Sequence, residues 1–399
     1  MIESQNNLNR EYLLLILSAA TFIIFFQLYM VAPLIPTLSL FFNTSSETVG
    51  LIIPAYLIPY GISTLFYGLL ADKIGMKTVT LLSLLCFCIF TACTALSQSV
   101  QQLIFWRFIT AVGAGGIIPT SLAWIGQNYK YELRGRPLGW LFGAMAGGGA
   151  TGSSLGVIME PFVGWKMLFL GVSIIGAIIW VVLYFGYQKV MMPEPIKNLL
   201  TFDKVFYGYR QLFVGQRGKR AYIFVLLNGI FHSGIFTWLG LYFQKVYSLD
   251  SLEIGLAILG YGVPGFLLGP YIGKLADRKG RRKLLPLGLA ISAISVFILA
   301  FDIPLYIAAI SVTTLSLGYD LTQPLLAGII TQVGKERPGQ AMSLNVFMLF
   351  LGFGLGSYLF GLALQVSLVD ALILFSTFQL VLSALALWLF KSEKNNEAI

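Results

Sequence analysis

The stretch GLLADKIGMK, residues 68–77, decides the fold, because this polar break between apolar runs occurs twice. Its second copy, GKLADRKGRR, stands at residues 273–282, and Gly, Ala, Asp and Gly recur at the same relative positions. Further pairs at this offset of 205 residues are Gly50 and Gly255, Tyr56 and Tyr261, Pro59 and Pro264, Gly113 and Gly318, and Pro119 and Pro324. A common spacing over so long a distance predicts two homologous halves of the chain.

The chain is far more apolar than a soluble domain. Of its 399 residues, 57% are hydrophobic and 11% are charged, and the mean hydropathy is +0.82. A membrane-spanning helix needs about 20 mainly apolar residues, whereas strands of a membrane barrel alternate over about ten. Candidate spans lie roughly at 12–36, 48–69, 78–96, 103–126, 138–158, 166–187, 221–243, 251–271, 284–300, 305–331, 341–363 and 369–390. The sequence therefore predicts an all-α membrane protein with 12 transmembrane helices.

The net charge of +9 is distributed unevenly along the chain. If both termini lie in the cytoplasm, 23 of the 26 Lys and Arg residues fall on that side, because only Lys166, Lys245 and the in-span Arg107 do not. Positive residues concentrate in cytoplasmic loops of membrane proteins. The charge thus predicts a multi-pass protein of the cell membrane with cytoplasmic N- and C-termini, in contact with membrane lipid and without a nucleic-acid partner. The first apolar run has no small-residue cleavage pattern, so we expect it to remain as the first helix.

The repeat and the loops predict how the chain is divided. We expect an N-terminal six-helix bundle at 1–187, a cytoplasmic linker at 188–220 and a C-terminal six-helix bundle at 221–399. The linker is the longest polar stretch, and its part 202–213 has the pattern of an amphipathic helix that lies on a membrane surface.

Two parallel six-helix halves joined by a basic loop resemble the major facilitator superfamily. The resemblance is carried by that family's signature between helices 2 and 3, and this chain holds the signature in both halves. Its residues are Gly68, Asp72, Lys73, Gly75 and Lys77 in the first copy, and Gly273, Asp277, Arg278, Gly280 and Arg282 in the second. Small residues allow close helix approach, and a carboxylate is stabilised at a helix N-terminus. The resemblance implies that both copies form a cytoplasmic gate, whereas the simpler alternative is an anchor of charges at the membrane edge.

Two further stretches are similar to the drug:proton antiporter branch of this superfamily. In LIFWRFITAVGAGG, residues 103–116, Arg107 stands four residues after a Leu, as in the branch pattern, although Thr110 and Ala111 replace the usual Gln and Gly. In GAMAGGGATGSSLG, residues 143–156, glycines recur every four residues, and Ser153 stands where the branch usually has Pro. Glycines at this spacing predict close helix packing.

Proton coupling needs a titratable group near the membrane midplane, and the sequence offers three candidates: Asp320, His232 and Arg107. An ionisable residue within a span is a functional-site candidate by default, and histidine titrates near neutrality. The alternatives are a hydrogen-bonded structural role for Asp320 and His232, and an Arg107 that extends to the membrane surface. The antiporter pattern usually has an acid where Gln27 stands, and Gln cannot carry the proton.

The resemblance places the substrate in a central cavity lined by helices 1, 4, 7 and 10. Candidate wall residues on these helices are Gln27, Tyr29, Asn228, Trp238, Tyr319 and Gln323. Many aromatic residues and few charges favour a small amphipathic or weakly polar molecule.

These observations favour a secondary active transporter of the efflux type, a monomeric multidrug or metabolite antiporter that exports its substrate by alternating access in exchange for protons. The alternative is an uptake porter for a sugar or an organic acid, which would have the same fold. An enzyme is disfavoured because the single histidine has no acidic neighbour, and a nucleotide-driven pump is disfavoured because no P-loop pattern occurs. We expect no cofactor and no metal, since Cys86, Cys88 and Cys93 share one apolar span without His or carboxylate.

Overall fold

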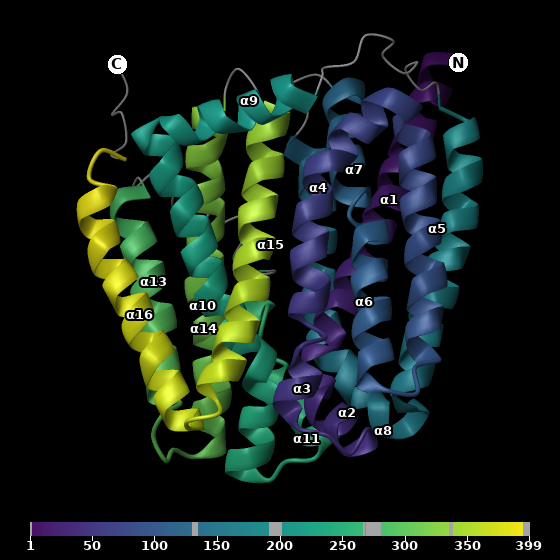
Figure 1. Ribbon diagram of the computed structural model, residues 1–399. Coiled ribbons are helices and arrows are strands. Elements are labelled where there is room, and N and C mark those ends of the chain that lie inside the picture. Colours follow the sequence, from purple (N-terminus) through teal and green to yellow (C-terminus); the bar gives the residue numbers. More distant parts are fainter. Residues whose placement is uncertain are drawn as a thin grey trace.

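The protein is helical throughout the part of the chain that the structure describes. The computed structural model covers residues 2–129, 135–190, 202–265, 268, 281–334 and 338–393 (Figure 1). The elements before the linker are α1 (Ile2–Met30), the 3-10 helix η1 (Ala32–Leu34), α2 (Ile35–Phe41), α3 (Ser46–Gly50), α4 (Pro54–Ile74), α5 (Met76–Ala95), α6 (Val100–Ala114), α7 (Ile117–Asn128) and α8 (Gly135–Gln188). After it follow α9 (Phe202–Val214), α10 (Gln216–Tyr247), α11 (Ser251–Ile258), α13 (Arg281–Ile298), α14 (Leu305–Val333), α15 (Pro338–Ala363) and α16 (Leu368–Leu389).

Length and hydropathy make this a multi-pass membrane protein. Nine helical segments of the described residues are long and apolar enough to cross a bilayer. One of them, residues 136–188, holds two of the spans expected from the sequence. The all-helical architecture is confirmed, and the total of twelve spans stays a prediction.

The two spans within α8 are joined at a single residue, Gly164. Its φ of 77° is non-helical, which a residue without Cβ adopts at little cost, and Pro161 precedes it inside the same helix. The chain therefore reverses direction between the two spans almost without a loop.

The long helices form two groups that stand side by side, with α1 and α4–α8 in one and α10 and α13–α16 in the other (Figure 1). The beginning of α1 and the end of α16 lie at the end of the molecule where α9 lies, here named the α9 end. The short helices α2, α3 and α11 lie at the opposite end, here named the α3 end. The boundaries 1–187, 188–220 and 221–399 remain a proposal for the domain organisation.

The two groups touch closely toward the α3 end. A Cβ added at Gly240 of α10 would stand 2.9 Å from the backbone oxygen of Pro33 in η1. One added at Gly262 would stand 2.8 Å from the Cβ of Ala150 in α8. Glycine thus lets backbones of the two groups approach each other, as small residues do between membrane helices. We name these contacts the α3-end seam.

The linker helix α9 lies across the α9 end and touches both groups (Figure 1). The hydroxyl of Tyr209 lies 3.4 Å from the carbonyl oxygen of Leu65 in α4, and it also interacts with Ser343 of α15. Phe206 and Tyr207 on the same helix are more than half exposed. The helix is amphipathic, as expected, and its buried face bridges the two groups.

One ion-pair cluster joins helices of the second group at the α9 end. Glu393, which follows α16, accepts two hydrogen bonds from Arg217, at 2.8 and 2.7 Å, and one from Arg220 at 2.6 Å. Its carbonyl oxygen accepts from the backbone N–H of Arg282, at the start of α13. We name this the Glu393 cluster, and it ties the chain after α16 to the starts of α10 and α13.

Candidate functional site

Asp320 lies in the middle of α14, inside the apolar body of the molecule. Its carboxylate accepts a hydrogen bond from Ser316 at 3.1 Å and one from the backbone of Gly265. Gly265 has no side chain, and an added Cβ would stand 2.7 Å from the carboxylate oxygen. The glycine therefore lets the acid approach the neighbouring backbone.

His232 of α10 belongs to the same region. Its Nε2 shares a hydrogen bond with the hydroxyl of Tyr261, and its ring stacks on Tyr319 with a centroid distance of 3.5 Å. Tyr319 precedes Asp320 in α14, and Asp320 interacts electrostatically with the hydroxyls of Tyr261, Tyr319 and, from the first group, Tyr29. The structure thus brings two of the proposed proton-coupling residues into one polar cluster that reaches across to α1.

The third candidate, Arg107 of α6, lies apart from this cluster. Its side chain is fully buried within the first group and does not extend to the surface. Nη1 donates to Oε1 of Gln27 at 2.8 Å, and the guanidinium carbon stands 4.0 Å from the ring centre of Tyr56. The structure therefore joins Arg107 to Gln27, a residue that the sequence suggested for the cavity wall.

A small cavity of about 20 Å³ lies between the two groups of helices. Its walls come from α1, η1, α4, α10 and α15 and the turn before α4, and they are mostly apolar: Leu28, Tyr29, Ala32, Ile53, Leu57, His232, Ser233, Phe236, Thr237 and Phe353. The rings of Tyr29 and Phe236 meet there, 5.2 Å apart. In this conformation the cavity has room for about one water-sized molecule, so a substrate needs the groups to separate.

The other suggested wall residues have different surroundings. Asn228 is buried and hydrogen-bonds Thr322 and Gln379, both within the second group. Trp238 donates its indole N–H to the carbonyl of Ser357 and packs against Gly50 at the α3-end seam. Gln323 is partly buried, with no hydrogen-bond partner for its Nε2 among the described residues.

The repeated motif is described in part. Gly68 and Asp72 belong to the backbone of α4, and the side chain of Asp72 lies outside the described part. Gly75 ends the helix with φ 89°, where Lys73 is exposed and Lys77 is half-buried. In the second copy, Gly273, Asp277, Arg278 and Gly280 lie outside the described residues, and Arg282 is the second residue of α13. Glycine at this positive φ explains why the motif needs Gly75.

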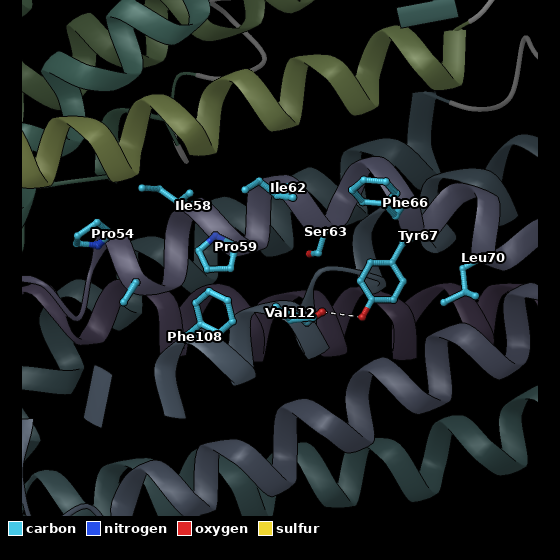
Figure 2. Close-up of a pocket in the computed structure, with 11 residues that line it drawn as sticks. Pro54, Ile58, Pro59, Ile62, Ser63, Phe66, Tyr67, Leu70, Phe108 and Val112 are labelled. Atoms are coloured by element: carbon cyan, nitrogen blue, oxygen red, sulfur yellow. Dashed lines mark hydrogen bonds between the residues drawn. The ribbon is translucent and has the colours of Figure 1, made fainter. Parts of the chain in front are cut away.

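A larger groove of about 610 Å³ runs along α4 and α6 (Figure 2). It is lined by apolar side chains, and Ile62, Phe66 and Phe108 among them are more than a third exposed. The Tyr67 hydroxyl donates to the carbonyl of Val112 at 2.6 Å across it (Figure 2). Exposed apolar side chains on spanning helices suit lipid contact, and this groove is separate from the central cavity.

Sequence reasoning missed two tyrosines that complete the site. Tyr56 packs on Arg107 and Tyr261 bonds His232, so each contacts the buried basic residue of its own group. Both positions were visible as one matching pair of the 205-residue repeat. The repeat therefore held a signal for the site as well as for the fold.

Many spanning helices in two groups, with a polar cluster and a small cavity between them, are typical of membrane transport proteins. Residues 17–259 and 221–399 match the Major Facilitator Superfamily, and the chain belongs to this family. Its identification as a multi-pass membrane transporter follows from this match and from the similar proteins below.

Several bacterial transporters are similar to the chain. The MFS-type transporter YhcA of Bacillus subtilis is 23% identical over 346 residues, which cover 74% of this chain and 64% of that protein. The riboflavin transporter RibZ of Clostridioides difficile is 22% identical over 378 residues, or 82% of each chain. Multidrug resistance protein 2 of Bacillus subtilis is 22% identical over 395 residues, or 98% of each chain.

A solved structure shares the fold. The crystal structure of a bacterial homologue of the human lysosomal transporter Spinster, inward-facing and unoccupied, superposes with a TM-score of 0.74. The match covers 98% of this chain and 99% of that one at 16% identity.

Proposed function

We propose that this protein exports a small amphipathic molecule from the cytoplasm in exchange for protons, as the drug:proton antiporter branch does. The observation that carries the proposal is the cluster of Asp320, His232, Tyr261 and Tyr319, which reaches Tyr29 of the other group. Apolar and aromatic walls beside it suit an amphipathic substrate. Its similarity to Multidrug resistance protein 2 over 98% of each chain supports export.

Transport in this proposal proceeds by alternating access. The α3-end seam closes one end of the central cavity, and the repeated motif closes the other end in the opposite state. In this proposal the α9 end faces the cytoplasm, because the described basic residues of the linker and of the motif lie there, among them Lys73, Arg210 and Arg282 (Figure 1). In one state the two groups touch each other at the α3 end, and in the other state they touch at the α9 end.

Asp320 couples the cycle to protons in this proposal. As a carboxylate it carries a negative charge at the boundary between the groups, and protonation removes that charge. A neutral side chain is cheaper to enclose in an apolar seam than a charged one. Proton binding from outside therefore favours one closed arrangement, and proton release inside favours the other.

Flux in proteoliposomes under an imposed pH gradient tests the proposal. With the aromatic carboxylate 2-naphthoate as probe, and with the flux into protein-free vesicles subtracted, we expect the gradient to accelerate transport by the wild type and to leave transport by Asp320→Asn unaffected. Asp302→Asn is the matched control, because Asp302 is an exposed acid in the turn before α14. A wild-type flux that ignores the gradient contradicts proton exchange, and an unchanged Asp320→Asn response removes the role of Asp320.

An uptake porter for an organic acid is the second candidate. Arg107 favours it, because a buried cation that has no acidic neighbour among the residues described suits an anionic substrate. The direction of gradient-driven flux separates the two candidates: export moves substrate against the proton gradient, and symport uptake moves it along the same direction as the protons.

A further inference from the structure

We propose that the transported molecule carries a carboxylate or a similar planar anionic group, and that Arg107 binds this group. The inference rests on the proposed transport function and names the chemical class of its substrate. It applies to export and to uptake alike.

Arg107 is buried and only partly bonded. Its side chain has no exposed surface, and the one hydrogen bond that it makes within the described part of the chain, from Nη1, goes to the neutral amide of Gln27. Nε and Nη2 have no hydrogen-bond partner among the described residues. Two nitrogens of the charged guanidinium are thus left without an acceptor among the described residues.

The described surroundings provide no counter-charge. Of the titratable groups that the structure describes, only Tyr56, which lies under the guanidinium, interacts with it electrostatically. Asp72 lies on the same helix as Tyr56 but 16 residues further on, which is about 24 Å along a helix. Asp320 interacts with Ser316, with the backbone of Gly265 and with the tyrosines of its cluster, and Arg107 is not among these groups. The tyrosine ring supplies a cation–π contact, which does not occupy N–H donors.

The free donors have a suitable geometry. Nε and Nη2 lie on one edge of the planar guanidinium, and this edge matches the two oxygens of one carboxylate. An unpaired buried charge is costly unless a partner neutralises it. Since the described chain offers no such partner, the edge is left for an anion that comes from outside the protein.

In this proposal the substrate reaches Arg107 from the central cavity, whose wall includes the chain neighbours of both contacts of Arg107. Gln27 is followed in α1 by Leu28, and Tyr56 is followed in α4 by Leu57, and both leucines line the cavity. The contacting rings of Tyr29 and Phe236 stand at its wall. A substrate with an aromatic or apolar body and an anionic end would therefore fit with its body at these rings and its anion toward Arg107.

Matched probes test this assignment in the purified full chain. We would measure thermal unfolding by tryptophan fluorescence with benzoate or 2-naphthoate, each beside its neutral carboxamide. We expect the carboxylates to stabilise the wild type, with affinity at least about tenfold above the amides, since a hydrogen bond to a charged group contributes about 1.5–3 kcal/mol. Lys166→Gln, at a cation outside the site, should retain this preference.

Two variants should abolish the preference. Arg107→Gln removes the cation, and Gln27→Glu gives it an internal partner, so Gln27→Glu should also unfold at a higher temperature than the wild type. If Arg107→Gln does not fold, the Gln27→Glu variant alone tests whether Arg107 binds the carboxylate. A wild type with no preference for the carboxylates, or a Gln27→Glu variant that keeps the preference, overturns the assignment. These binding measurements need no pH gradient, so they are independent of the flux test. Proton-coupled transport can be disproved while anion binding is confirmed, and anion binding can be disproved while proton-coupled transport is confirmed.

Discussion

Tyr56 and Tyr261 are corresponding residues of the repeat with related contacts. One lies against a guanidinium, and the other bonds an imidazole. The basic residues themselves are not paired by the repeat, because Arg107 corresponds to Val312 and His232 to Gln27. Each half has therefore kept the tyrosine and changed what the tyrosine contacts. This divergence fits a site whose two sides perform different tasks.

Gly265 offers a test of the Asp320 site that leaves the acid in place. In Gly265→Ala the new Cβ would stand 2.7–2.8 Å from the carboxylate atoms, so Asp320 must shift. Such overpacking costs about 1–3 kcal/mol. We expect gradient-driven flux to fall by about five- to a hundredfold, with the protein still folded.

Gly171→Ala is the control for this substitution, because a Cβ there meets nothing within 4 Å. The measurements are flux under a pH gradient and the unfolding temperature of each variant. Normal gradient-driven flux in Gly265→Ala would show that the position of Asp320 is unimportant.

The sequence could suggest single residues of the candidate site, but it could not suggest their partners. Asp320 and Arg107 stand out because charges within apolar spans are rare and costly. That Gln27 bonds Arg107 depends on how α1 and α6 are placed against each other, and residue spacing within either helix carries no such information. The same holds for Asn228, whose partner Gln379 lies 151 residues away.

At the scale of elements, the Glu393 cluster shows how a short segment joins several helices. Burial raises the pKa of the Glu393 carboxyl, but the hydrogen bonds and charges of Arg217 and Arg220 outweigh burial and hold that pKa below its usual value of 4.5. The ionised acid therefore stabilises the fold at pH values above about 4.5. This stabilisation is lost as the pH falls through the lower pKa of the folded state.

We expect Glu393→Gln to lower the free energy of unfolding at neutral pH by about 1–2 kcal/mol, since charged hydrogen bonds are lost but Arg217 is partly exposed. Below pH 4 the difference from the wild type should shrink. Ser392→Ala, which removes only a neutral partner of Arg220, is the control. Equal unfolding curves at neutral pH would show that the cluster contributes nothing to stability.

At the scale of the whole molecule, the two groups of helices contact each other toward the α3 end, and the described part of the repeated motif, at the end of α4 and the start of α13, lies at the α9 end (Figure 1). The fold was predictable from the repeat because duplicated glycines and polar breaks mark duplicated helices. The sequence could not predict which end of the molecule has the two groups in contact. That depends on residues that meet between the groups, such as Gly240 and Pro33.

Substitutions at the two ends should shift the conformational equilibrium in opposite directions. Gly240→Val obstructs the seam against the Pro33 backbone and should favour the state open at the α3 end, by about tenfold. Asp72→Ala weakens the proposed cytoplasmic gate and should favour the state open at the α9 end. The reporter is a single cysteine in the cavity wall, Ser233→Cys, in a chain whose Cys86, Cys88 and Cys93 are replaced by Ser. Its rate of reaction with an impermeant thiol reagent, added from either side of the membrane, measures which side of the cavity is open.

Gly171→Val serves as control for the larger side chain, because its position is open. If Asp72→Ala leaves both rates unchanged, the motif is an anchor of charges and not a gate. If Gly240→Val leaves them unchanged, the seam does not determine which side of the cavity is accessible.

The bridge made by α9 has a practical consequence. Tyr209 touches α4 of one group and α15 of the other, so the groups cannot rock apart at that end without altering the surroundings of this helix. Its neighbours Phe206 and Tyr207 are exposed, so a cysteine introduced at either position would accept a thiol-reactive fluorescent dye. The fluorescence of such a dye would report conformational changes during transport before the substrate is known. Compound collections could then be screened for molecules that change the conformation of the transporter.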